Sequence, residues 1–333
     1  MFKNILIFGH SNIGDVCYDL AVVDPLRKKF PQARITFLTT ARCKGIVDGY
    51  KGIDKIIIFD RKAKNKSFVS QLQFIFILRK EKFDLTVVLK KSLRYKFLGI
   101  PEVWRVEGNG GSQQKHLVDS YLKLLCDHGV EVGETSFSFG LDENDRAFCA
   151  DFLSRKGIGA DDMLIGILPL AAWPMKSWPV KKWNKLAEVI KNQYGIKMIN
   201  LGKTPDTDFG RRVSEEISDE IISADKSTLA QAKALLKRCQ LFIGPDSSFL
   251  HLASCMGIEA IGLYGATSSE HFFPYFHRRN IVCPEKRLSC MPCYPGAGPS
   301  CQNGETEYDF GPCMEAIRVE DVLAVIKEKL NLV

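Results

Sequence analysis

Short apolar runs alternate with amphipathic segments along the whole chain of 333 residues. The first run, 4–8, is followed by Gly9 and has the length and composition of a strand that is buried on both faces of a parallel sheet. The amphipathic segment after it ends in three basic residues before Pro31, as expected at the end of a helix. The N-terminus therefore predicts a strand followed by a helix.

The same alternation continues to the C-terminus and predicts two sets of elements. Strands are expected at 4–8, 34–39, 55–59 and 84–89, and then at 164–168, 196–201, 241–243 and 260–264. Helices are expected at 15–30, 41–47, 68–82, 115–128 and 143–156, and then at 180–194, 208–217, 229–239, 247–256 and 319–330. Strands that alternate with helices form parallel sheets with helices on both faces.

The length of the chain fits two α/β domains of similar size. We place one Rossmann-like domain at 1–150 and a second at 151–333. Two consecutive units of this kind imply a cleft between them, and open α/β sheets bind ligands at the carboxyl ends of their strands. Candidate chemistry is therefore expected in the loops that follow strands.

Composition and charge narrow the classes of function. Hydrophobic residues make up 45% of the chain and charged residues 26%, as in globular proteins. We find no apolar stretch long enough to span a membrane and no signal peptide, so a cytoplasmic location is expected. The net charge is +7, and the segment 79–96 has seven basic residues against two acids. Such a patch attracts phosphate groups or an anionic membrane, whereas no motif indicates nucleic acid as a partner.

The loop after the first strand carries a candidate acid. Its glycines permit a close approach to a ligand, and the helix that follows favours anions at its start. The glycine spacing differs from that of dinucleotide-binding enzymes, which makes a dehydrogenase the least favoured class. Asp15 falls in the first helical turn, where it either stabilises the helix dipole or acts as a general base on an acceptor hydroxyl.

Two loops of the second half carry polar side chains after a strand. In the first, Lys176 is either a solvated side chain or a cation for a diphosphate leaving group. In the second, the hydroxyls of Ser247 and Ser248 accompany the free amides of a helix start, which suits a phosphate. A helical histidine such as His251 is more often structural, but here it lies about one turn from that helix start.

An Asp-Thr-Asp triplet begins at Asp206, after Pro205 and before a predicted helix. Its residues either cap that helix or bind the hydroxyls of a ribose.

Five of the eleven cysteines lie in the segment 283–313. Cys290 and Cys293 form a Cys-x-x-Cys pair, and Cys301 and Cys313 follow it. Four thiols with one close pair fit a structural zinc or iron site, and the alternatives are free buried thiols or a redox pair.

Taken together, these segments resemble glycosyltransferase family 9, the ADP-heptose:lipopolysaccharide heptosyltransferases, over nearly the whole chain. The family signatures are Ser-x-Ile-Gly-Asp, Leu-Arg-Lys-x-Phe-Pro, Lys-x-Trp-Pro, Asp-Thr/Ser-Gly-x-x-His-x-Ala and Tyr/Phe-Gly-x-Thr. They match 11–15, 26–31, 176–179, 246–253 and 264–267. Each motif is short, but their order and spacing are specific. Ser248 replaces a common glycine, and Tyr18 and Asp19 stand where the family usually has small or hydroxyl residues.

The resemblance implies a GT-B fold, with two facing Rossmann-like domains of parallel sheets and a cleft between them. The N-terminal domain would take the acceptor, and the C-terminal domain a nucleotide sugar such as ADP-heptose. The implied reaction is an inverting transfer that is metal-independent and requires no cofactor, with Asp15 as the catalytic base. The implied pathway is the assembly of a lipopolysaccharide core on a lipid A-type acceptor.

The resemblance also implies which residues bind the substrates. The donor-binding residues would be Lys176, Asp206, Asp246, Ser247, Ser248 and His251. The acceptor is a phosphorylated glycolipid, and its binding residues would be Gly14, Lys90, Lys91, Arg94 and Lys96. The four basic residues among these could also make peripheral contact with the inner membrane. Many family members carry a similar cysteine-rich tail, and autotransporter-directed relatives hold iron there.

Two other functions fit the same architecture. A nucleotide-sugar epimerase would need additional acid and base residues at the cleft. A catalytically inactive sugar-nucleotide-binding protein would have no need to keep Asp15, Lys176 and His251 together. Both are less favoured than a glycosyltransferase.

Overall fold

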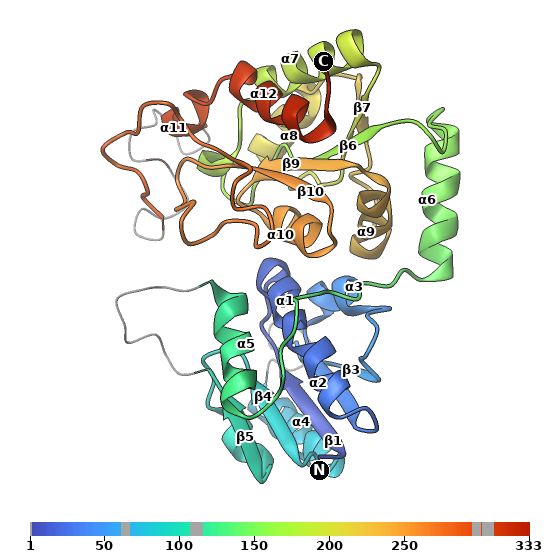
Figure 1. Cartoon of the computed structure of the whole chain (residues 1–333), viewed down its shortest axis with the longest axis vertical. Coiled ribbons are helices and arrows are strands. Elements are labelled where there is room, and N and C mark those ends of the chain that lie inside the picture. Colours follow the sequence, from blue (N-terminus) through green and yellow to red (C-terminus); the bar gives the residue numbers. More distant parts are fainter. Residues whose placement is uncertain (1, 61–66, 107–115, 295–300, 302–309) are drawn as a thin grey trace. The chain divides into compact units, whose positions relative to one another are not determined.

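The computed structural model describes residues 2–60, 67–106, 116–294, 301 and 310–333. The chain divides into two compact units, Met1–Asp142 and Glu143–Val333. Each unit is a parallel sheet with helices on both faces, as the alternating pattern predicts (Figure 1). Helix α6 (Glu143–Arg155) spans the predicted boundary at residue 150 and belongs entirely to the second unit.

The sheet of the first unit has five parallel strands in the order β3-β2-β1-β4-β5. The strands are β1 (Asn4–Phe8), β2 (Arg34–Thr39), β3 (Lys55–Ile58), β4 (Leu85–Val88) and β5 (Glu102–Arg105). β1 is central and its Ile5, Leu6 and Ile7 are fully buried, because helices cover both faces of the sheet. β5 is an edge strand that the sequence analysis did not predict.

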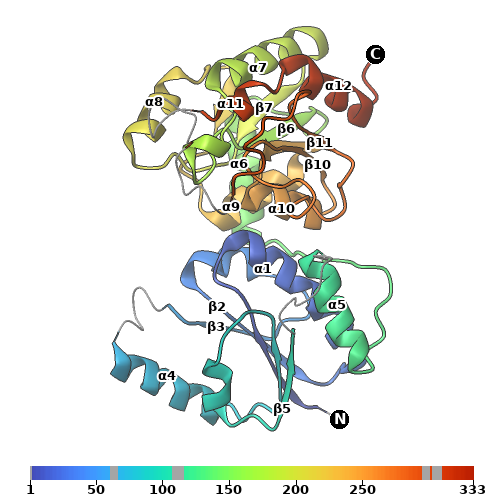
Figure 2. The same ribbon diagram turned by 90° about the vertical axis from the view of Figure 1, so that its left-hand side faces the viewer.

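The helices of the first unit lie on the two faces of this sheet. They are α1 (Ile13–Asp19), α2 (Val23–Lys29), α3 (Lys44–Val47), α4 (Phe68–Lys80) and α5 (Leu117–Asp127), with the 3-10 turns η1 (Leu20–Val22), η2 (Ala41–Cys43) and η3 (Arg94–Leu98). α4 and α5 lie on opposite faces (Figure 2). Leu6 and Phe8 belong to the same apolar cluster as Leu78 of α4.

The single helix predicted at 15–30 is interrupted. α1 ends at Asp19, η1 forms one 3-10 turn, and α2 begins at Val23. Pro25 lies in the first turn of α2, where its missing amide proton is tolerated, but its ring clashes with a regular helical turn before it. The interruption therefore follows from the proline.

The second unit has six parallel strands in the order β11-β10-β9-β6-β7-β8. They are β6 (Leu164–Ile167), β7 (Lys197–Asn200), β8 (Ile221–Ser223), β9 (Leu241–Pro245), β10 (Glu259–Leu263) and β11 (Ile281–Val282). The two edge strands, β8 and β11, were not predicted from the sequence. In both units the parallel order brings the carboxyl ends of all strands to one edge of the sheet.

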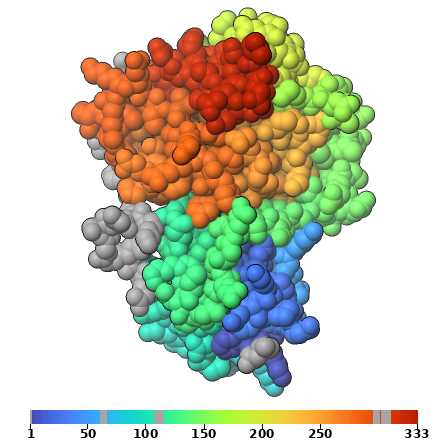
Figure 3. Space-filling view, viewed as in Figure 1, coloured from blue at the N-terminus to red at the C-terminus, as the bar shows by residue number. Residues whose placement is uncertain are grey.

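The remaining helices cover this second sheet. They are α6, α7 (Val180–Tyr194), α8 (Asp208–Glu216), α9 (Leu229–Arg238), α10 (Ser248–Cys255), α11 (Pro312–Glu315) and α12 (Val319–Leu330), with the 3-10 turn η4 (Pro174–Lys176). α7 and α12 lie on one face, and α9 and α10 on the other (Figure 1). The red side chains of α12 form part of the surface of this unit (Figure 3). Among the described residues, no helix could cross a membrane.

Candidate active site

The loop between β1 and α1 holds the predicted catalytic acid. Asp15 lies in the first turn of α1, half-buried, and Gly14 precedes it in the same turn. The side-chain amide of Asn12, the residue before the helix, donates a hydrogen bond to Asp15 Oδ2 at 3.1 Å. The carboxylate is therefore oriented and accessible at the carboxyl end of the central strand, as a general base requires.

A buried carboxylate that the sequence analysis did not assign lies beneath this loop. Asp19 is fully buried on α1. Its Oδ2 accepts from the backbone N–H of His10 at 2.5 Å, and its Oδ1 lies 2.8 Å from His10 Nδ1. The hydroxyl of Tyr121, on α5, lies 3.5 Å from the same ring nitrogen. Asp19 thus holds both the backbone and the side chain of His10.

The charges around His10 favour its protonated form. Burial alone would lower the pKa of His10, but the hydrogen bond to Asp19 and the charges of Asp19 and Asp15 outweigh it and raise that pKa. The charge of Lys90 acts in the opposite direction. His10 is therefore electrostatically coupled to the predicted base Asp15.

The glycine that opens this loop has a steric role. A Cβ atom on Gly9 would lie 2.8 Å from Asp19 Oδ2, closer than van der Waals contact allows. Gly9 therefore lets the backbone lie directly on the buried carboxylate. On the far side of the loop, the thiol of Cys43 donates to the carbonyl of Ser11 at 3.3 Å.

The predicted basic residues follow β4, which pairs with β1, and therefore lie at the same sheet edge as Asp15. Lys90 Nζ lies 5.0 Å from the centre of the Phe8 ring. Burial lowers the pKa of Lys90, and the charge of Asp19 opposes that effect. A hollow of about 740 Å³ is lined by Lys90, Lys91 and Arg94, together with Arg105, which the sequence analysis missed.

The fourth predicted basic residue, Lys96, has a different position. It lies on η3 and is exposed, and it is not among the described residues that line the hollow. The predicted basic patch therefore divides into a group around the hollow and a group on the outer surface.

In the second unit, Asp246 follows β9 and joins two predicted donor residues. Its Oδ2 lies 3.0 Å from Lys176 Nζ, and its Oδ1 lies 3.2 Å from His251 Nε2. Burial alone would raise the pKa of Asp246, but the hydrogen bond to His251 and the charge of Lys176 lower it to about 2. Asp246 is therefore ionised at neutral pH and fixes the positions of Lys176 and His251.

Lys176 also makes cation–π contacts with two aromatic rings. Lys176 Nζ lies 6.0 Å from the Trp173 ring centre and 5.4 Å from the Tyr294 ring centre. The two ring centres are 5.1 Å apart. Attraction to both faces keeps the cation at one place while leaving it able to meet an anion. The second tryptophan of this segment, Trp178, is a core residue whose indole donates to the carbonyl of Ile317 at 3.1 Å.

The two predicted serines stand at the start of α10. Ser247 is the N-cap residue, and its hydroxyl accepts from the backbone N–H of Leu250 at 3.4 Å. Ser248 is the first residue of the helix and is half-buried. The hydroxyl of Ser247 caps the helix as an acceptor and keeps its own proton to donate, so both hydroxyls and the backbone amides can bind an anion.

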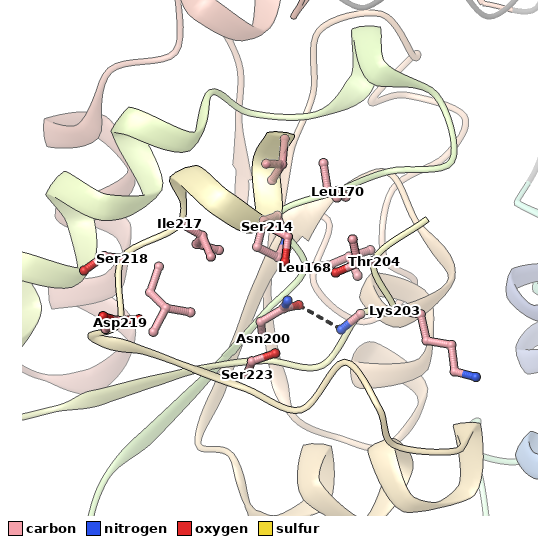
Figure 4. Close-up of a pocket in the computed structure, with 14 residues that line it drawn as sticks. Leu168, Leu170, Asn200, Lys203, Thr204, Ser214, Ile217, Ser218, Asp219 and Ser223 are labelled. Atoms are coloured by element: carbon pink, nitrogen blue, oxygen red, sulfur yellow. Dashed lines mark hydrogen bonds between the residues drawn. The ribbon is translucent and has the colours of Figure 1, made fainter. Parts of the chain in front are cut away.

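Asp206 has no capping role. It is exposed and lies 3.0 Å from Arg211 Nη1, whereas the hydroxyl of Thr207 caps α8 by accepting from the N–H of Gly210. A hollow of about 150 Å³ lies near this segment, at the ends of β6, β7 and β8 (Figure 4). Asn200 lines it, and its side-chain oxygen accepts from the N–H of Gly202 at 2.9 Å.

The structure does not support the predicted metal site. Cys290, Cys293, Cys301 and Cys313 all belong to the described residues, and none of them forms a disulfide there. Within the described parts of the chain, no three His, Cys, Asp or Glu side chains are arranged to hold a metal ion. Burial raises the pKa of Cys313 to about 12, and the neighbouring Cys293 and Cys301 add to this effect. The arrangement fits the alternative of buried and partly buried thiols without a disulfide.

The chain matches a family described as glycosyltransferase family 9 (heptosyltransferase) over residues 104–296. It is 26% identical over 306 residues to the lipopolysaccharide core heptosyltransferase OpsX of Haemophilus influenzae, an alignment that covers 84% of each protein.

Solved structures share the fold over nearly the whole chain. A family 9 glycosyltransferase from Veillonella parvula gives a TM-score of 0.82 at 21% identity and covers 99% of this chain and 97% of its own. ADP-heptose lps heptosyltransferase II of E. coli gives 0.74 at 19% identity, with 99% and 98% covered. The two parallel-sheet units are therefore those of the GT-B fold.

Proposed function

Because this chain belongs to glycosyltransferase family 9, we propose that it transfers a heptose from ADP-heptose to a lipopolysaccharide core or lipid A-type acceptor. OpsX is named a lipopolysaccharide core heptosyltransferase, and the E. coli structure is named an ADP-heptose lps heptosyltransferase. Both names support this choice of substrates. The observation that carries the proposal is a pair of polar sites, one per unit. In the first unit the oriented carboxylate of Asp15 follows β1. In the second unit Lys176 forms an ion pair with Asp246, the residue that follows β9.

In this proposal Asp15 acts on the acceptor. Its carboxylate removes the proton from an acceptor hydroxyl, and the hydroxyl oxygen forms a bond to the anomeric carbon of the donor sugar. The bond from that carbon to the diphosphate breaks, and its electron pair leaves with the diphosphate. Attack from the side opposite the leaving group inverts the configuration at the anomeric carbon.

The residues around Asp246 act on the leaving group. Lys176 supplies a positive charge for the diphosphate, and its contacts with Asp246, Trp173 and Tyr294 fix that charge before the reaction begins. We propose that this cation stabilises the developing charge, so that transfer is independent of a metal ion and of any other cofactor.

Other groups of the second unit complete the proposed donor site. The start of α10, with Ser247 and Ser248, binds phosphate oxygens, and His251 keeps Asp246 in place. Asp206, which is exposed, takes a ribose hydroxyl. The hollow of about 150 Å³ is smaller than most pockets for a whole ligand, so it would hold one part of the nucleotide.

The first unit, 1–150 in the sequence analysis, is proposed to take the acceptor. Lys90, Lys91, Arg94 and Arg105 bring four cations to one hollow, which suits a phosphorylated sugar, and Gly14 leaves room beside Asp15. Because the donor is a nucleotide sugar and the acceptor a glycolipid, we place the reaction at the cytoplasmic face of the inner membrane. Nucleic acid has no part in the proposal.

Binding of nucleotide ligands tests the donor half of the proposal. A ligand that binds only the folded protein raises its melting temperature, so ADP-heptose should stabilise it more than GDP-, UDP- and CMP-linked sugars do. Lys176→Ala should weaken ADP binding by about tenfold to a hundredfold, the loss of one charge-assisted contact. Lys185→Ala is the matched control, since this exposed lysine of α7 pairs with Glu188.

The outcomes separate three cases. A rise in melting temperature with ADP-heptose that persists in EDTA supports ADP-heptose as the donor and its binding without a metal ion. Selective stabilisation by a different nucleotide would replace ADP-heptose as the donor. An equal loss of affinity in Lys176→Ala and Lys185→Ala, or no response to any nucleotide, would contradict the proposed donor site.

A further inference from the structure

Helix α4 exposes large apolar side chains along its whole length. Phe68, Val69, Leu72, Phe76 and Ile77 have between 39% and 75% of their surface exposed. The opposite side of the helix packs on the sheet through the apolar cluster described above. A helix that is apolar all round is normally buried, so an exposed side of this kind indicates a binding surface.

The neighbouring turn η3 extends this apolar surface. Leu93 and Phe97 are 64% and 58% exposed, and both also line the hollow of the proposed acceptor site. The guanidinium of Arg79, at the end of α4, donates from Nε to the carbonyl of Phe97 at 2.8 Å and so joins the two segments. We call these seven exposed apolar side chains of α4 and η3 the α4–η3 surface. α4 lies along the outer edge of the first unit (Figure 2).

The charge that borders this surface has one sign. The sequence contains no acid at 67–80 or at 85–101. Arg79, Lys80, Lys91 and Lys96 are exposed in these segments.

The two acids between these segments are already paired. Glu81 lies 2.6 Å from Lys55 Nζ, and Asp84 accepts from the backbone N–H groups of Lys3 and Asn4. The exposed charged side chains at 67–80 and 85–101 are thus all cationic, and they accompany the seven exposed apolar side chains of the α4–η3 surface.

We propose that the α4–η3 surface docks on an anionic lipid bilayer. Its apolar side chains would enter the boundary between headgroups and acyl chains, and the bordering cations would meet lipid phosphates. A second copy of this chain fits less well, because a symmetric contact would place the same cations opposite one another. The inference rests on the proposed function in one respect: a lipid-anchored acceptor gives the enzyme a reason to bind a membrane.

Flotation with lipid vesicles tests the inference directly. The vesicles contain phosphatidylcholine and phosphatidylglycerol in a ratio of 7:3, with no glycolipid acceptor and no donor. We expect the unchanged protein to float with them, and Phe76→Ser/Ile77→Ser to partition at least about tenfold more weakly, since it lacks two of the apolar side chains that would enter the lipid. Lys80→Glu, high salt and vesicles of phosphatidylcholine alone should each weaken binding.

Leu117→Ser is the matched control, because Leu117 is an exposed apolar residue of α5 in the same unit. It should float like the unchanged protein, and unchanged melting temperatures would show that all variants fold. The inference is overturned if the unchanged protein does not float, or if Phe76→Ser/Ile77→Ser floats equally well. It is also overturned if sedimentation shows a dimer that the double variant loses, which would assign the surface to a second copy.

A water-soluble, deacylated acceptor separates this inference from the proposed function. Phe76→Ser/Ile77→Ser should transfer sugar to it at the unchanged rate, because no membrane is involved. If the unchanged protein floats but transfers nothing, the proposed function fails and the docking surface stands.

Discussion

At the scale of single residues, the sequence identified the groups that follow strands, and the structure shows how they are held. Asp15 and Asp246 each lie beyond a buried strand, and this position could be predicted from the apolar runs before them. Their partners within a few residues, such as Asn12 and His251, could also be seen in the sequence. Partners distant in sequence could not be predicted, because no local pattern indicates which distant residue a side chain contacts.

The contact of Tyr121 with His10 illustrates that limit. Tyr121 reaches His10 from α5, 111 residues away, and a buried aspartate in a helix has no sequence signature of its own. The contact of the Tyr294 ring with Lys176 was missed for the same reason, whereas Trp173 lies in the same loop as Lys176. The predicted metal site is unsupported, because the described residues contain no group of three His, Cys, Asp or Glu side chains arranged to hold an ion, although Cys293 and Cys301 lie near Cys313.

The raised pKa of His10 predicts how the stability of the first unit depends on pH. Its ordinary pKa is 6.5, so between that value and the higher folded-state pKa the folded protein holds a proton that the unfolded chain releases. The stabilisation is fully present below about pH 6.5 and is lost as pH rises through the folded-state pKa. Asp19→Asn should remove this pH dependence.

Hydrogen exchange of the amides of β1, corrected for the intrinsic effect of pH, reports the stability of this unit. Between about pH 6 and 8.5 the protection should fall in the unchanged protein and should change much less in Asp19→Asn. His277→Gln is the control, because burial lowers the pKa of this histidine, which lies in the second unit. An equal decline in the unchanged protein and Asp19→Asn would contradict the assignment.

At the scale of elements, the long and strongly patterned segments were the predictable ones. The helices at 180–194 and 319–330 begin and end where the sequence places them, and the central strands differ from prediction by a residue or two. The edge strands β5, β8 and β11 were missed. β5 has a charged residue at each end, and β8 and β11 have only three and two residues, so none of them shows the clear apolar run of the edge strand β3.

The connection between α5 and α6 shows how a segment without regular structure is fixed. The backbone N–H of Lys51 donates to the carbonyl of Ser138 at 3.0 Å, and the hydroxyl of Ser138 donates to Asp24 at 2.8 Å. The ring centres of Tyr50 and Phe139 are 5.2 Å apart. Residues 136–140 are therefore held on the first unit by backbone, side-chain and ring contacts.

A glycine in this connection provides a test. A Cβ atom on Gly140 would lie 2.0 Å from the carbonyl oxygen of Gly49, so the backbone must move to accept it. We expect Gly140→Ala to destabilise the first unit by about 1–3 kcal/mol, the usual cost of overpacking. The midpoint of urea unfolding measures this change. Gly133→Ala is the control, because no described atom lies within 4 Å of its Cβ position; equal midpoints in the two variants would contradict the packing.

At the scale of the whole molecule, each unit carries its candidate chemistry at the carboxyl edge of its own sheet. In the first unit the polar loop after β1 and the cations after β4 meet because these strands are neighbours. In the second unit β6 and β9 are neighbours, and the loops after them bring Lys176 to Asp246. The alternation of strands and helices predicted both edges before any contact was known.

The central claim is that the chain transfers a sugar with Asp15 as the base. The most direct measurement is the rate of heptose transfer from ADP-heptose to a phosphorylated lipid A-type acceptor, for the unchanged protein and for Asp15→Asn. We expect the unchanged protein to form a product of inverted anomeric configuration, and Asp15→Asn to lower kcat by about 10²–10⁴ while its affinity for ADP stays the same. Transfer by Asp15→Asn at the unchanged rate, or no transfer by the unchanged protein, would contradict the account.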